Sequence, residues 1–289
     1  MDRENRADIA IIGTGPAGLS AAINAKIRKK NFLLFGSPDL SHKVEISQRL
    51  DNYPGLIQIT GKELNQTYKA QLQTMDISIE NARITGIYDM GGYFCLSTGQ
   101  KEYEAFTVIL ATGNETVKPL PGEREYLGRG VSYCATCDGN LYKGRTIAVV
   151  CDNEEMEEEA VYLSELAQTV HYFPIYKSSL TGSNIIRHDS SVKSVHGGEM
   201  VNGIVLQNGE ELAVDGVFFL KNAVAADVLL HGLETKDGHI VVDRSMATNI
   251  KGCYAAGDCT GRPYQIAKAV GEGNVALHSA ISYLAKIKK

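Results

Sequence analysis

Residues 8–18 read DIAIIGTGPAG, an apolar strand that runs directly into a glycine-rich turn. Gly13, Gly15 and Gly18 follow the spacing G-x-G-x-x-G, and the apolar stretch from Leu19 predicts the helix that this motif requires. The first glycine permits a tight turn, the second lets backbone approach a pyrophosphate, and the third lets helix and strand pack closely. The helix N-terminus offers N–H groups and partial positive charge to phosphate. The stretch predicts a dinucleotide-binding domain.

The next predicted strand, 32–35, ends at Gly36 and Ser37, where an acidic residue often holds a ribose hydroxyl. That acid is absent, so this turn alone does not identify the cofactor. Further along, residues 61–75 predict a helix and residues 77–107 predict short strands separated by glycine turns. A buried strand over 108–113 ends in a glycine, and the prolines and glycine at 119–122 indicate a domain boundary.

Two cysteines, Cys134 and Cys137, are separated by two residues and followed directly by Asp138. This spacing suits a small disulfide that opens to a dithiol, with a carboxyl group beside it to move protons. The alternative is half of a zinc site, which needs a second pair of ligands. Cys253 and Cys259 have the wrong spacing to supply that pair. A redox centre is therefore favoured, and no metal is expected.

A second strand and helix of the nucleotide-binding type follow, over 144–150 and 156–167. The turn between them contains no glycine, and six acidic residues lie between Asp152 and Glu159. These carboxylates repel a pyrophosphate, although acidic residues also suit a helix N-terminus. The strand over 170–176 ends near Lys177 without an arginine pair for a 2′-phosphate. The sequence of this region predicts a domain that keeps the fold of a nucleotide-binding domain but lacks the residues that bind the nucleotide.

The C-terminal region predicts a short strand that closes on Gly257 and Asp258, followed by a last helix over 267–286. An acid at a strand end, opposite the first glycine turn, can hydrogen-bond the hydroxyl groups of a cofactor.

The composition is that of a globular protein: 289 residues, 44% hydrophobic and 22% charged, with a net charge of −5. The length favours two domains, and the charge gives no overall attraction to nucleic acid or anionic membrane. The N-terminus lacks the pattern of a signal peptide, and no apolar run reaches the length of a membrane span. Six cysteines, of which two are closely paired, do not form a disulfide framework. We expect a cytoplasmic protein.

The chain resembles the low-molecular-weight thioredoxin reductases, which are flavoproteins. The motifs that carry this resemblance occur in the family's order and span nearly the whole chain: 13–18, 51–55 (DNYPG), 111–113 (ATG), 134–139 (CATCDG) and 256–258 (AGD). The resemblance implies an α/β fold of two Rossmann-like, three-layer ββα nucleotide-binding domains, with the second inserted in the first. The FAD-binding domain would comprise residues 1–115 and 244–289, and the inserted CxxC domain residues 116–243. The resemblance to the family also implies a homodimer.

Site residues follow from the same resemblance. Cys137 would exchange electrons with the flavin, Cys134 would attack the disulfide of thioredoxin, and Asp138 would act as acid and base. The residues expected to contact FAD are Gly13, Gly15, Pro16, Ala17, Gly18, Asn52, Ala111, Thr112, Gly113, Gly257, Asp258, Gln265, Ile266 and Ala267.

The chain departs from the family at the NADPH site, because both the glycine turn and the arginine segment are missing. It is more similar to the ferredoxin-dependent flavin thioredoxin reductases of anaerobic bacteria. We therefore expect electrons to pass from reduced ferredoxin through FAD and the cysteine pair to thioredoxin. The basic residues over 26–30 and the lysine-rich tail over 286–289 can guide an acidic ferredoxin. The alternatives are an NADPH-dependent reductase with an atypical site, a dithiol oxidase that uses oxygen, and a non-catalytic flavin-binding protein.

Overall fold

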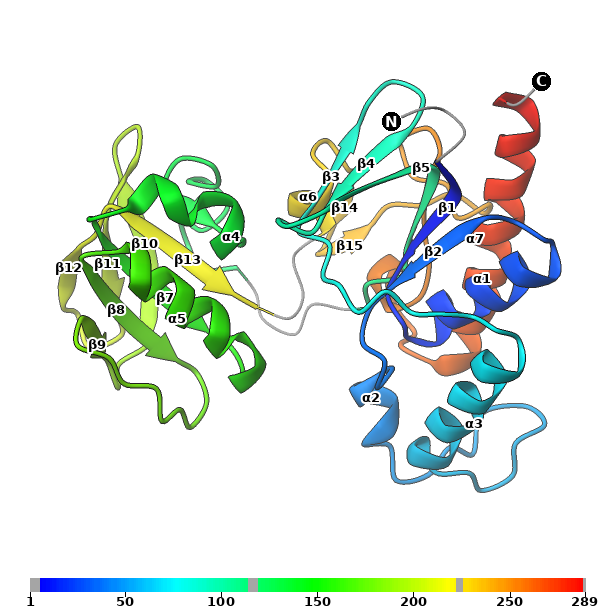
Figure 1. Ribbon diagram of the computed structural model, residues 1–289. Helices are drawn as coiled ribbons and strands as arrows, with labels where there is room; N and C mark the ends of the chain where they lie inside the picture. The colour runs from blue at the N-terminus through cyan, green and yellow to red at the C-terminus, as the bar shows by residue number, and fades with distance from the viewer. Residues whose placement is uncertain (1–5, 114–118, 222–225, 288–289) are drawn as a thin grey trace. The chain divides into compact units, whose positions relative to one another are not determined.

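The computed structural model describes residues 6–113, 119–221 and 226–287, and the chain forms two compact units (Figure 1). The first unit combines Met1–Glu115 with Ala225–Lys289, and the second is Thr116–Val224. The expected first boundary, at residue 115, falls outside the described residues. Residues 226–243, which the sequence analysis expected in the inserted domain, are grouped with the first unit. Leu229, Leu230 and Ile240 of this segment pack into the core on one face of the first unit's sheet.

The first unit is built on a sheet of six strands in the order β2-β1-β5-β4-β3, with β16 also paired to β5. Its strands are β1 (Ala7–Ile12), β2 (Phe32–Phe35), β3 (Gly86–Asp89), β4 (Phe94–Ser97), β5 (Glu102–Leu110) and β16 (Cys253–Ala255). β1, β2, β5 and β16 are parallel to one another, and β4 runs antiparallel to both of its neighbours, β5 and β3. Parallel strands end at the same edge of a sheet. Gly13, Ala111 and Ala256 directly follow β1, β5 and β16, so they lie close together at that edge.

Two helices cover one face of this sheet, α1 (Pro16–Ile27) and α7 (Ile266–Ile287), as Figure 1 shows. They approach closely because Gly273 of α7 has no side chain, and a Cβ there would lie 2.1 Å from the carbonyl oxygen of Ala17. α1 begins at Pro16 and not at Leu19, since the fixed φ of proline suits the first helical position. The opposite face is covered by the segment containing α6 (Ala226–Leu229), β14 (Thr235–Lys236) and β15 (His239–Ile240).

Two further helices, α2 (His42–Glu45) and α3 (Gly61–Thr74), complete the first unit. α3 begins with a capping box, in which Thr60 and Glu63 each accept a hydrogen bond from the other's backbone. Among the described residues, no helix is long and apolar enough to cross a membrane.

The second unit has a five-stranded parallel sheet in the order β6-β13-β7-β8-β9 and a separate antiparallel sheet, β10-β11-β12. The parallel strands are β6 (Val131–Ser132), β7 (Thr146–Cys151), β8 (Thr169–Pro174), β9 (Ile185–Arg187) and β13 (Gly216–Leu220). The antiparallel strands are β10 (Val192–Gly197), β11 (Val201–Leu206) and β12 (Glu211–Ala213). The helical segments are α4 (Ala135–Asp138), η2 (Gly139–Tyr142), η3 (Glu154–Met156) and α5 (Glu157–Leu166). The predicted α/β fold with two Rossmann-like units is confirmed.

A buried ion pair holds the strand that leads to the cysteine pair. Glu123 is fully buried, and its Oε1 lies 2.5 Å from both the Lys221 Nζ and the Tyr133 hydroxyl, each of which donates a hydrogen bond. The other carboxylate oxygen accepts from the Leu120 backbone N–H at 2.8 Å. Buried charges are tolerated when they are paired and fully hydrogen-bonded, as here. The pair thus fixes Tyr133, directly before Cys134, to the end of β13.

Candidate functional site

The glycine turn after β1 is shaped by two close backbone contacts. A Cβ on Gly13 would lie 2.1 Å from the Ala111 carbonyl oxygen, and φ at Gly13 is +118°. A Cβ on Gly18 would lie 1.8 Å from the Gly13 carbonyl oxygen. Only glycine fits at either position, and the turn is held between the ends of β1 and β5.

Gly15 differs, because nothing lies within 4 Å of the position that its Cβ would take. It precedes α1, whose first turn has no acidic residue and no side-chain cap, and Pro16 contributes no N–H. The first turn of α1 therefore begins beside open space at Gly15, and no side chain caps its backbone N–H groups. This open, positively polarised helix N-terminus fits the pyrophosphate of a dinucleotide.

The end of β16 lies against the same turn. A Cβ on Gly257 would lie 3.0 Å from the Ala17 Cβ, so the two turns are in contact. Glu272 of α7 accepts hydrogen bonds from the Gly257 backbone N–H at 2.9 Å and from the Lys268 Nζ at 3.0 Å. The turn that presents Asp258 is therefore held by α7, and the sequence analysis missed both α7 residues.

Asp258 has an ionic partner that the sequence analysis also missed. Its Oδ2 lies 2.5 Å from the Lys43 Nζ, so a residue 215 positions away supplies the counter-charge. No short motif connects the two residues, and only the folded chain brings them together.

The other residues expected to contact FAD differ in exposure. Gln265 precedes α7, Ile266 begins it, and Ala267 follows in its first turn with an exposed side chain. Gly113 has open space at its Cβ position, and Asn52 is exposed in the loop before α3. These contacts with the cofactor stay predictions.

In the second unit, Cys134 and Cys137 form a disulfide with a Cα–Cα distance of 5.3 Å. Cys134 is buried and precedes α4, where its Sγ accepts a hydrogen bond from the Cys137 backbone N–H at 3.2 Å. Cys137 is exposed. The two sulfurs therefore lie in different surroundings, although the sequence motif is nearly symmetric.

Asp138 is held by Ser132, a residue that the sequence analysis did not single out. The Ser132 hydroxyl donates to Asp138 Oδ2 at 2.6 Å and accepts from the Cys134 backbone N–H at 3.1 Å. Ser132 is buried at the end of β6. The role of this carboxylate in transferring protons as the sulfurs change state stays a prediction.

The turn after β7 leads into an acidic first turn of α5, which carries Glu157, Glu158 and Glu159. Tyr176 and Ser178 donate hydrogen bonds to Glu157 Oε1, the first at 2.8 Å, and the Tyr172 hydroxyl lies 2.9 Å from that of Tyr176. Burial raises the pKa of Tyr172 to about 12 and also raises the pKa of the Cys151 thiol. A carboxylate and neutral hydroxyl groups therefore satisfy one another at this turn. Asn153, which precedes η3, does not cap this helical segment with its side chain.

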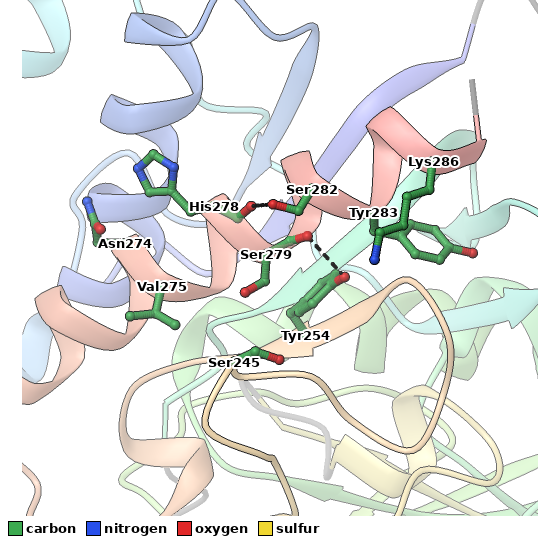
Figure 2. Close-up of a pocket in the computed structure, with 9 residues that line it drawn as sticks. All are labelled: Ser245, Tyr254, Asn274, Val275, His278, Ser279, Ser282, Tyr283 and Lys286. Carbon is green, nitrogen blue, oxygen red and sulfur yellow. Dashed lines mark hydrogen bonds between the residues drawn. The ribbon is translucent and has the colours of Figure 1, made fainter. Parts of the chain in front are cut away.

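An open hollow of about 490 Å³ lies along α7, between its residues 274–286 and two residues outside it, Ser245 and Tyr254 (Figure 2). The Tyr254 hydroxyl donates to the Ser279 carbonyl oxygen at 3.3 Å across this hollow. None of the expected cofactor or redox residues lines it. Within the part of the chain that the structure describes, no three His, Cys, Asp or Glu side chains gather as a metal site.

Comparison with known proteins gives one consistent result. The family model described as pyridine nucleotide-disulphide oxidoreductase matches residues 7–151 and 175–273. A thioredoxin reductase of Treponema pallidum is 34% identical, over 96% of this chain and 97% of its own length.

Solved structures agree with this. A ferredoxin-flavin thioredoxin reductase of Clostridium acetobutylicum is 49% identical, with a TM-score of 0.88, and covers 100% of this chain and 99% of its own. The atypical thioredoxin reductase TRi of Desulfovibrio vulgaris is 32% identical, with a TM-score of 0.71 and coverage of 97% and 98%. The chain therefore belongs to the pyridine nucleotide-disulphide oxidoreductase family, as a flavin disulfide reductase of the thioredoxin reductase type with FAD as its cofactor.

Proposed function

We propose that the chain passes electrons from reduced ferredoxin, through FAD and the Cys134–Cys137 pair, to the disulfide of thioredoxin. One observation carries the choice of donor: the first turn of α5, where a family member would hold a nicotinamide nucleotide, carries three glutamates, and Glu157 is held there by hydrogen bonds from Tyr176 and Ser178. The similarity to a ferredoxin-flavin thioredoxin reductase supports the same donor.

The first turns of α1 and α5 differ in charge and in space. The turn of α1 has no acid, and Gly15 leaves room beside it. The turn of α5 carries Glu157, Glu158 and Glu159. A pyrophosphate would meet three carboxylates there, and like charges at short distance repel strongly in a partly buried site. The family model also leaves out residues 152–174, which contain this turn and α5.

The proposed direction of electron flow is favourable. Ferredoxins of the plant type have reduction potentials of about −400 mV, and that of thioredoxin is about −270 mV. The difference of roughly 130 mV corresponds to about 6 kcal/mol for two electrons. Bound FAD supplies a centre that accepts electrons singly and gives them up in pairs.

The residues of the second unit have distinct proposed roles. Two electrons and two protons convert the Cys134–Cys137 disulfide to two thiols. Cys134 then attacks the disulfide of thioredoxin and releases one thiol, and Cys137 resolves the mixed disulfide and releases the second. The Cys137 N–H stabilises negative charge on Cys134 Sγ, while Ser132 orients Asp138 to carry the protons.

A surface for the donor is proposed from charge. Lys26, Arg28 and Lys29 are exposed at the C-terminal end of α1, and part of the basic tail, Lys288 and Lys289, lies outside the described residues. If an acidic ferredoxin docks on this basic surface, its turnover must slow as the salt concentration rises.

The donor is tested by following the flavin absorbance of the anaerobic protein after separate additions of NADPH, NADH and reduced ferredoxin. We expect reduced ferredoxin to bleach the flavin and oxidised thioredoxin then to restore the colour. Bleaching by a nicotinamide nucleotide at a catalytic rate would show that the turn at Cys151–Glu159 is functional, and the proposal would fail.

The proposed FAD cradle predicts the effect of Gly15→Ala. The fold accepts an added methyl group at residue 15, because φ of Gly15 is −78° and no atom lies within 4 Å of its Cβ position. The methyl group would, however, occupy the space in which we expect the pyrophosphate to bind. FAD affinity should fall at least about tenfold, with an unchanged melting temperature of the FAD-free protein. Titration of FAD-free protein with FAD measures this loss. Gly271→Ala, at another open glycine on α7, is the matched control and should leave the affinity unchanged.

The cysteine roles are tested with a thioredoxin that has one active-site cysteine, activated as a mixed disulfide with an aromatic thiol. Cys137→Ser leaves Cys134 free and should couple to this thioredoxin at least about tenfold faster than Cys134→Ser. Non-reducing gels follow the coupling, and the Cys134→Ser/Cys137→Ser variant gives the background. Because Cys137 is the exposed sulfur, the opposite order is a real alternative, and observing it would exchange the two roles.

A further inference from the structure

The acidic first turn of α5 reaches the redox helix. The backbone N–H of Ala135, the first residue of α4, donates a hydrogen bond to Glu159 Oε2 at 3.3 Å. Glu159 lies in the first turn of α5, two residues beyond Glu157. One carboxylate of this acidic turn is thus directed at the N-terminus of the helix that follows Cys134.

Close packing fixes this contact. Ala135 is fully buried in one core cluster with Ala160 and Leu163 of α5. A Cβ on Gly139, which directly follows α4, would lie 3.1 Å from Leu166 Cδ1 and 3.2 Å from Leu163 Cδ2, so the chain packs tightly against α5 here. The position of the Glu159 carboxylate is therefore set by the contact between α4 and α5.

The carboxylate and the reactive sulfur share the same helix N-terminus. Cys134 Sγ accepts from the Cys137 N–H at 3.2 Å, within the turn whose first N–H is bonded to Glu159. Among the ion pairs of the described residues, none includes Glu159 or Asp138. The negative charge beside Cys134 is thus not neutralised by a salt bridge.

This charge affects the two redox states differently. Reduction of the disulfide takes two electrons, with two protons when both thiols form and with one proton when Cys134 is left as a thiolate. Backbone N–H groups favour the thiolate, and active sites that stabilise a thiolate are the stronger oxidants. A neighbouring carboxylate opposes that stabilisation and leaves the disulfide form relatively more stable.

We propose that Glu159 lowers the reduction potential of the Cys134–Cys137 pair, so that the reduced pair is a stronger reductant toward its target disulfide. Glu159 acts through Cys134 and is a positioning residue in this reaction. The inference rests on the proposed function only in that the two cysteines exchange electrons reversibly, and it is independent of the donor. It also gives the acidic turn a second role beside the exclusion of phosphate.

The test compares the wild type with Glu159→Gln, whose side-chain oxygen can still accept from Ala135. The full-length, FAD-loaded proteins are equilibrated with defined ratios of reduced and oxidised dithiothreitol at pH 7, quenched and alkylated. Mass spectrometry of the peptide with residues 134 and 137 then gives the reduced fraction. We expect the equilibrium constant for reduction of the pair to rise about threefold to tenfold, where tenfold corresponds to about 30 mV.

Glu158→Gln is the matched control, because it removes the same charge from the same turn of α5 but its side chain is exposed. It should change the constant less than about twofold, and Glu159→Asp, which keeps the charge, should stay near the wild type. Equal constants for the two glutamine variants, an unchanged constant for Glu159→Gln, or a fall in that constant would each overturn the inference. A wild-type pair that does not titrate reversibly would overturn both this inference and the proposed function.

Discussion

A helix N-terminus binds a phosphate only when the turn before it leaves space and unopposed backbone N–H groups. The first unit depends on this constraint. Gly13 and Gly18 let β1, α1 and β5 approach to distances that no other residue allows, and Gly15 keeps the front of α1 open. The second unit repeats the strand–turn–helix arrangement with side chains at every position of the turn. There the first turn of the helix carries Glu157, whose carboxylate accepts hydrogen bonds from Tyr176 and Ser178. The same type of fold therefore provides the proposed cofactor site in the first unit and positions the cysteine pair in the second.

The cysteine pair is supported from two sides within its own unit. On one side, the buried Glu123 carboxylate binds Tyr133 and Lys221, and so fixes the backbone directly before Cys134. On the other side, α5 packs on α4 and brings Glu159 to its first N–H. Rigid support of this kind keeps reacting groups in place, which matters because misplacement by about 1 Å costs a large factor in rate. It also sets the charge around the sulfurs, and hence the balance between disulfide and dithiol.

Much of this arrangement could be predicted from the sequence, since it rests on local backbone requirements. The glycine spacing at 13–18, the cysteine spacing at 134–137 and the missing glycine after β7 each concern a few consecutive residues. The contacts that complete the sites could not be predicted in this way. Lys43 reaches Asp258 from 215 positions away, Glu159 reaches Ala135 from another helix, and Ser132 meets Asp138 across a single turn. The packing of Leu229 and Leu230 against the first unit's sheet is likewise a contact between segments far apart in the sequence.

We propose that the carboxylates of the first turn of α5 keep the second nucleotide turn from binding phosphate. Equilibrium dialysis of the FAD-loaded protein against labelled NADPH tests this claim most directly, because it measures binding without requiring electron transfer. The account predicts no saturable binding up to about millimolar NADPH, a concentration that corresponds to only about 4 kcal/mol of binding free energy. Saturable binding of one NADPH per chain at micromolar concentration would contradict it.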